Sequence, residues 1–97
     1  MPDYLVTPPA REDLKDIGRH TQKVWGRAQR NSYLRDLDRV FSQLATDPTK
    51  GRDRSDLRPG LMAAPCNKHM VFFRRDPQGQ VVILRILHQR MDFERRL

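Results

Sequence analysis

Apolar residues recur along this chain with two different periods, one in each half. In the first half, apolar or small residues are spaced four and three apart, as on one face of an α-helix: Ala10, Leu14, Ile17, Thr21, Val24 and Ala28. The spacing resumes beyond Gly26 and stops before Pro48, at Tyr33, Leu37, Val40 and Leu44, with Leu34, Phe41 and Ala45 widening the face. This pattern predicts two amphipathic helices that form an antiparallel hairpin bent at Gly26.

The second half contains apolar runs separated by turn residues. Three antiparallel strands are expected at 61–66, 69–75 and 80–88, with turns at Asn67 and at 76–79. A short apolar run at 4–6, stopped by two prolines, predicts an opening strand, with Thr7 as N-cap of the first helix and Glu12 and Asp13 near the positive end of its dipole.

The resulting order is strand, helix, helix, strand, strand, strand, within a single α+β domain over residues 1–97. The apolar faces of the hairpin need the mainly antiparallel sheet to cover them. Residues 46–60 contain prolines, glycines and many charges, which predicts a solvated loop. The tail at 91–97 is expected to form a short C-terminal helix or an irregular end.

Charge narrows the choice of partner. Lys and Arg total 19 against 12 acidic residues, a net charge of +7. Such a surface favours an acidic partner, which could be nucleic acid, a membrane surface or an acidic polypeptide. Most of the basic residues are arginine, whose fork suits carboxylate and phosphate, although a GC-rich genome would produce the same bias.

Several function classes find no support in the residues. Cys66 is the only cysteine, so no internal disulfide can form, and the three histidines have no recognised zinc-ligand spacing with it. We therefore expect neither a metal nor a cofactor. No apolar run approaches the roughly 20 residues of a membrane span, and a cytoplasmic protein is expected.

His88 is the strongest candidate for catalysis. With Arg85 and Arg74 it could supply the base and the cations of a ribonuclease. Positions 85 and 88, however, point to opposite faces of a regular strand, so the two side chains could not converge without a bulge. The alternative is a structural or surface histidine, which is the commoner role.

Direct binding to DNA or RNA also has little support. The basic residues Arg74, Arg75, Arg90, Arg95 and Arg96 lack aromatic stacking platforms, because Phe72 and Phe73 alternate faces. The second helix also carries acidic residues, which work against contact with phosphates.

Three motifs together resemble ParE-type toxins of bacterial ParDE toxin-antitoxin modules, in the RelE/ParE superfamily. They are the Trp-Gly pair at 25–26, the Arg-Pro-Gly at 58–60 and the Arg-x-Leu-His-x-Arg-Met-Asp at 85–92, and the similarity runs nearly end to end. Two departures occur. Met62 and Ala63 stand where related chains often have basic residues, and Asn67 replaces a frequent turn glycine, which Asn tolerates.

The resemblance implies a RelE/ParE-like fold and a toxin that inhibits DNA gyrase, blocks replication and arrests growth, as in plasmid or chromosome maintenance. It also implies a ParD-like antitoxin whose acidic C-terminal segment wraps the toxin in a hetero-oligomer and whose N-terminal dimer binds operator DNA. The toxin would then reach the operator only through the antitoxin. A RelE-like, ribosome-dependent mRNA interferase is the alternative, but Phe93 stands where a nuclease would use a titratable residue.

Two sets of residues are expected to bind partners. The predicted target-binding residues are Arg85, His88, Arg90, Met91, Asp92, Arg95, Arg96 and Leu97. The predicted antitoxin-binding residues are Trp25, Tyr33, Leu37, Phe41 and Arg74. A cationic domain with an apolar hairpin suits an acidic amphipathic segment, because apolar burial gives affinity and complementary charge speeds encounter.

Overall fold

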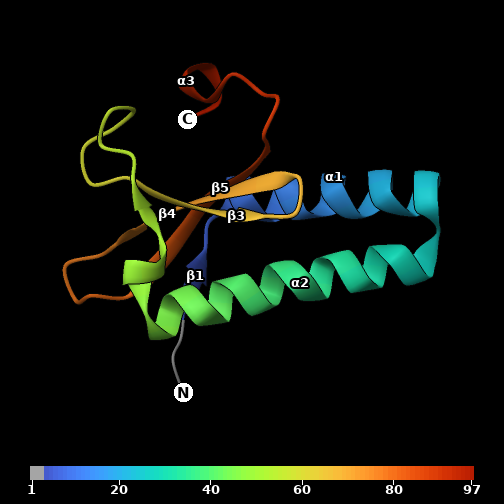
Figure 1. Cartoon of the computed structure of the whole chain (residues 1–97), viewed down its shortest axis with the longest axis horizontal. Helices are drawn as coiled ribbons and strands as arrows, with labels where there is room; N and C mark the ends of the chain where they lie inside the picture. Colours follow the sequence, from blue (N-terminus) through green and yellow to red (C-terminus); the bar gives the residue numbers. More distant parts are fainter. Residues whose placement is uncertain (1–3) are drawn as a thin grey trace.

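The computed structural model describes residues 4–97, so the first three residues of the expected 1–97 domain lie outside the described part. The elements in chain order are β1 (Tyr4–Val6), α1 (Pro8–Trp25), α2 (Arg27–Thr46), a 3-10 turn η1 (Pro48–Lys50), β2 (Arg52–Asp53), β3 (Met62–Cys66), β4 (His69–Arg75), β5 (Val81–His88) and α3 (Phe93–Arg96). The sheet has the order β1-β5-β4-β3-β2, and only the β1–β5 pair is parallel. The predicted α+β fold is confirmed, with α1 and α2 side by side as an antiparallel hairpin and α3 apart from them (Figure 1).

The ends of α1 follow from single residues. The Thr7 hydroxyl oxygen accepts a hydrogen bond from the N–H of Ala10 at 3.3 Å and donates one to the carbonyl of Leu84 at 2.9 Å. Gly26 separates the two helices with φ of 94°, a conformation that side chains other than glycine rarely adopt. The predicted N-cap and bend are therefore confirmed. The first turn of α1 carries no acidic residue, so the expected interaction of Glu12 and Asp13 with the helix dipole is wrong.

The core lies on both faces of the sheet. On the hairpin side, buried residues of α1 and α2 meet buried residues of β3, β4 and β5, among them Ile17, Leu37, Phe41, Val71, Phe73 and Ile83. On the far side, a smaller cluster of Leu61, Ala63, Phe72 and Leu87 is covered in part by Phe93 and Leu97. The predicted apolar stripe of α1 no longer contributes to the core at Val24, which is 52% exposed. The reason is that the helical hairpin extends beyond the strands at this end (Figure 1).

Residues 46–60 hold more structure than the sequence predicts. Arg52 and Asp53 form β2 by pairing with Ala63 and Met62 of β3, and η1 precedes them. Gly51 permits this path, since a Cβ at this position would overlap the ring of Phe73. The loop prediction is therefore wrong for 48–50 and 52–53.

A β-bulge interrupts the pairing of β4 with β5. Phe73 is opposite Ile83 while Phe72 is opposite Arg85, which leaves Leu84 as the extra residue. The bulge precedes Arg85, so the strand alternates regularly from there to His88. As a result His88 lies toward the helical hairpin, whereas Arg85 reaches the edge of β5.

Candidate functional site

Arg85 and Asp13 tie three elements together. The Asp13 carboxylate of α1 accepts hydrogen bonds from Arg85 Nε at 2.7 Å and Nη2 at 2.9 Å, and its Oδ2 also accepts the backbone N–H of Ile86 at 2.9 Å. Arg85 Nη1 in turn donates to the carbonyl of Arg96 at 2.7 Å. The bond to Asp13 raises the pKa of Arg85. Asp13 thus accepts a backbone N–H of β5 at a point where β1 has already ended. Arg85 links α1 and β5 to α3.

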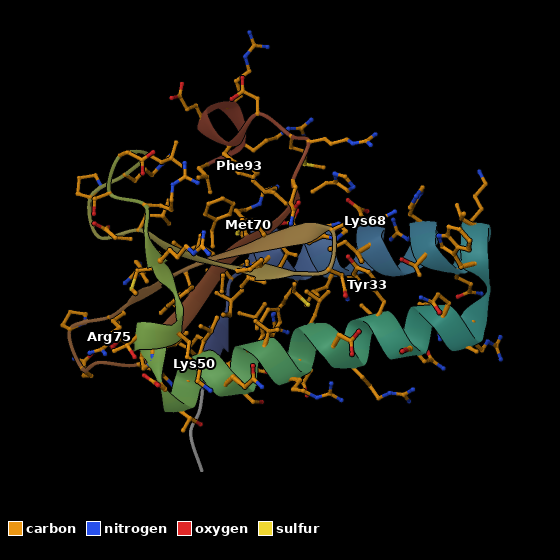
Figure 2. The ribbon with its side chains drawn as sticks, in the orientation of Figure 1. Tyr33, Lys50, Lys68, Met70, Arg75 and Phe93 are labelled. Atoms are coloured by element: carbon orange, nitrogen blue, oxygen red, sulfur yellow. The ribbon has the colours of Figure 1, made fainter. Side chains whose placement is uncertain are left out.

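The C-terminal helix is held against the far face of the sheet. The ring of Phe93 meets Phe72 edge to face, with centroids 4.9 Å apart, and Arg58 donates a hydrogen bond to the carbonyl of Leu97. Figure 2 shows Phe93 in α3, on the far side of the sheet from α2. These contacts fix the backbone that carries the exposed residues of the C-terminal surface: Arg90, Met91, Asp92, Arg95 and Arg96.

The C-terminal surface combines charge with an apolar contact point. Three of its five side chains are guanidinium groups, and Met91 is 39% exposed. Arginine and methionine are enriched in protein interfaces, where arginine forms bidentate pairs and methionine adapts to irregular surfaces. The arrangement can therefore bind an acidic protein surface.

A cavity of about 510 Å³ lies between β1, α1 and α2, and we call it the hairpin groove. Its apolar lining includes Tyr4, Leu14, Leu34 and Phe41, and its cationic residues are Lys15, Arg19 and Arg30. The Tyr4 hydroxyl donates to Asp38 Oδ1 at 2.5 Å, and burial together with that bond raises the pKa of Tyr4 to about 12. The groove can accept an apolar side chain while its cations face an acidic neighbour.

A second cavity, of about 670 Å³, contains all three histidines of the chain, and we call it the histidine cavity. His20 comes from α1, while His69 and His88 are directly opposite each other in the β4–β5 pair, with ring centroids 5.3 Å apart. Tyr33 enters from α2, and Figure 2 shows it near Lys68 in the turn between β3 and β4. The cavity therefore joins the hairpin to the ends of two central strands.

Hydrogen bonds engage the Nδ1 atoms of both strand histidines. The Tyr33 hydroxyl accepts the N–H of Lys68 at 3.3 Å and forms a second hydrogen bond with His69 Nδ1, 2.5 Å away. His88 Nδ1 accepts the backbone N–H of Arg90 at 3.1 Å. The neutral His88 ring consequently carries its proton on Nε2. Burial, and then the proximity of His88, lowers the pKa of His69 to about 4.

This arrangement is poorly suited to general-base catalysis. A histidine base needs a ring nitrogen with a free lone pair facing the substrate, but Nδ1 of His88 accepts the N–H of Arg90 and Nδ1 of His69 is paired with the Tyr33 hydroxyl. Within residues 4–97, no group of three or more His, Cys, Asp or Glu is placed to hold a metal ion. The histidine cavity can donate hydrogen bonds, and it offers no prepared base.

The predicted antitoxin-binding residues do not form one surface. Trp25 is 69% exposed at the tip of the hairpin, and Arg74 is exposed near the end of β4. Tyr33 is half-buried in the histidine cavity. Leu37 and Phe41 are 0% and 3% exposed, so their place in a binding surface is corrected, because they fill the space between hairpin and sheet.

The predicted target-binding residues are also divided. Arg90, Met91, Asp92, Arg95 and Arg96 lie together on the C-terminal surface, and Leu97 is half-buried against the far-side cluster. Arg85 is instead hydrogen-bonded to Asp13 and to the carbonyl of Arg96, and His88 to the N–H of Arg90. The sequence interpretation missed Asp13 and His69, whose partners lie 72 and 36 residues away along the chain.

Comparison with known proteins identifies the family. The family described as "ParE toxin of type II toxin-antitoxin system, parDE" matches residues 4–93. The chain belongs to the ParE toxin family. It is a ParE-type toxin of a type II toxin-antitoxin system, as the sequence motifs indicated.

Individual ParE toxins align over nearly the whole chain. Toxin ParE1 of Mycobacterium tuberculosis is 36% identical over 97% of this chain and 96% of its own length. Toxin ParE of Escherichia coli is 36% identical over 100% and 94%, and Toxin ParE3 of Caulobacter vibrioides is 37% identical over 100% and 96%.

Solved structures support the same fold. A chain from the structure titled "Chromosomal ParDE TA system from P. aeruginosa" superposes with a TM-score of 0.77 at 22% identity, covering 91% of this chain and 96% of that chain. A chain of the RelBE2 toxin-antitoxin complex from Mycobacterium tuberculosis has a TM-score of 0.57 at 27% identity, with coverage of 89% and 98%. In the described part of this ParE-type toxin, neither long helix is apolar enough to span a bilayer.

Proposed function

We propose that this ParE-type toxin inhibits DNA gyrase by binding it, so that replication stops, and that a ParD-like antitoxin neutralises it. The observation that carries the proposal is the C-terminal surface, where cations and an exposed methionine lie on α3 and on the turn before it, and α3 is anchored through Phe93, Arg58 and Arg85. A rigid surface of this kind loses little conformational entropy on binding. The occupied Nδ1 atoms of His69 and His88 further support inhibition by binding over catalysis.

The target contact is assigned to the exposed members of the predicted set. The five residues of the C-terminal surface contact the target directly. Arg85, His88 and Leu97 instead hold the backbone of this segment in place. Arg85 does so by holding the carbonyl of Arg96, and Leu97 by packing on the far-side cluster.

The antitoxin contact is assigned to the hairpin groove and to Trp25. An acidic amphipathic segment can place an apolar side chain against Leu14 and Leu34 while its carboxylates face Lys15 and Arg19. Trp25 offers a large exposed aromatic surface at the hairpin tip, and such side chains commonly dominate interface energies. The net charge of +7 favours this encounter.

Two double variants with equal loss of charge test the assignments separately. Arg95→Ala with Arg96→Ala should abolish inhibition in a gyrase supercoiling assay and leave antitoxin affinity within about twofold. Lys15→Ala with Arg19→Ala should weaken antitoxin binding about tenfold, roughly 1.4 kcal/mol, and leave gyrase inhibition intact. Antitoxin affinity is measured by titration calorimetry.

Unchanged supercoiling alongside growth arrest would contradict the proposal. Translation would then be the process to examine, because the remaining candidate is a RelE-like mRNA interferase. Cleaved message in a reconstituted translation mixture, lost on His88→Ala, would establish that function instead.

A further inference from the structure

The histidine cavity and the hollow beside it share only Trp25 with the antitoxin contact and Arg90 with the target contact assigned above. The lining of the cavity brings together an exposed indole from α1, imidazole rings from β4 and β5 and an ammonium group from the turn between β3 and β4. We propose that this cavity binds a nucleotide, with the base stacked on Trp25 and the phosphate held by Lys68 and Arg90.

The size and the aromatic wall suit a base. About 670 Å³ falls within the roughly 300–1,000 Å³ typical of small-molecule sites. Trp25 is 69% exposed although it is the largest aromatic side chain of the protein, and it lines the cavity beside Val24. Every nucleobase has a π-face that can stack on an indole, so this contact requires no particular base.

The imidazoles supply directional hydrogen bonds to the base. His88 presents an Nε2–H, because its Nδ1 accepts the N–H of Arg90, and His69 keeps its Nε2 for a ligand because its Nδ1 is paired with Tyr33. Both imidazoles line the cavity, where His69 is half-buried between Tyr33 and His88. Carbonyl oxygens and ring nitrogens of bases are acceptors that match such donors.

The phosphate position follows from a neighbouring hollow. A depression of about 290 Å³ is lined by Lys68, His88, Gln89 and Arg90, and it shares Lys68 and His88 with the histidine cavity. The two spaces are therefore adjacent, with Lys68 and His88 between them. Lys68 and Arg90 are both exposed, so they can close on a phosphate without a large desolvation cost.

The acidic residue in the lining does not oppose this binding strongly. Asp36 Oδ2 accepts a hydrogen bond from Asn67 at 3.2 Å, and Asp36 Oδ1 lies 3.6 Å from Arg39 Nη1. These partners offset its charge. A carboxylate also has lone pairs left to accept an N–H of the base.

Fluorescence of the full chain tests the proposal directly, because Trp25 is its only tryptophan. Titration with GMP should quench the emission in a saturable manner. Lys68→Gln should weaken binding about fivefold, whereas Lys50→Gln, which removes the same charge from an exposed lysine away from the cavity, should leave it unchanged (Figure 2). His88→Leu should reduce affinity more than His88→Gln, whose amide keeps an N–H donor at the same reach.

The source of the nucleotide is distinguished by a second titration. Saturation with GMP assigns the site to a free nucleotide. A response only to a single-stranded oligonucleotide, with the same loss in Lys68→Gln, assigns it to an unpaired nucleic acid chain. The proposal is overturned if neither ligand quenches the emission at concentrations up to about 1 mM, or if Lys50→Gln weakens binding as much as Lys68→Gln.

Discussion

Asp13 should matter more to the stability of this toxin than any of its exposed carboxylates. Asp13→Ala removes both hydrogen bonds to Arg85 and leaves the N–H of Ile86 without its partner at the edge of β5. The side chains of Asp13 and Arg85 are only 12% and 25% exposed, so water replaces these contacts poorly.

The magnitude follows from the two lost interactions. Removing one partner of a fully buried ion pair costs about 3–5 kcal/mol, and the partial exposure here reduces this to about 2 kcal/mol. The unpaired N–H of Ile86 adds about 1 kcal/mol. The free energy of unfolding should fall by about 3 kcal/mol, which lowers Tm by roughly 12–24 °C for a domain of this size.

Urea denaturation followed by circular dichroism measures the change. Asp13→Asn should lose only about 1–2 kcal/mol, because its amide oxygen still accepts the N–H of Ile86. The matched control is Asp16→Ala, three residues away on α1, where the carboxylate is 70% exposed and the loss should stay below about 0.5 kcal/mol. A loss below about 1 kcal/mol for Asp13→Ala would refute the structural role of this contact.

Three further changes probe other parts of the fold. Gly26→Ala should lower the free energy of unfolding by about 1–3 kcal/mol in urea, since φ is 94° there, and an unchanged midpoint would contradict the bend. The pKa of His69 is about 4 in the folded chain and 6.5 in the unfolded chain, so between these values the unfolded chain binds the proton first. The stability that neutral His69 provides is therefore complete above pH 6.5 and is lost as the pH falls toward 4. His69→Gln should therefore flatten the dependence of the urea midpoint on pH in that interval, and an unaltered slope would exclude His69 as the cause. Phe93→Ala should cost about 1–2 kcal/mol and speed amide exchange in α3, and full protection there would show that other contacts hold the helix.

Elements with many periodic positions were predictable from the sequence. The helical spacing located both long helices, and alternation with turn residues located β3, β4 and β5. The two-residue strand at Arg52–Asp53 has neither signal, since both residues are charged and exposed. It forms because Gly51, which has no side chain, lets the backbone pass close to the ring of Phe73. Phe73 is 22 residues away along the chain, so the residues around position 51 give no signal for this contact.

The candidate site was predictable only where its residues are contiguous. Arg90, Met91, Asp92, Arg95 and Arg96 are exposed together because they lie within seven consecutive residues of the chain. The histidine cavity instead depends on strand register. Arg75 pairs with Val81 next to the turn at 76–79. Without a bulge, this register would place His69 opposite Leu87. The extra residue Leu84 shifts the register by one, so that His69 is opposite His88. The sequence gives no signal for that extra residue.

The position of β5 between β1 and β4 also affects how the toxin matures on the ribosome. The helical hairpin is synthesised first, yet the first strand has no neighbour until residues 81–88 have been added. At roughly 5–20 residues per second, the 42 residues from Thr46 to His88 take about 2 to 8 seconds to translate. During this interval the nascent chain holds a complete helical hairpin whose sheet-facing side is still uncovered, because β3, β4 and β5 are not yet all available to pack against it.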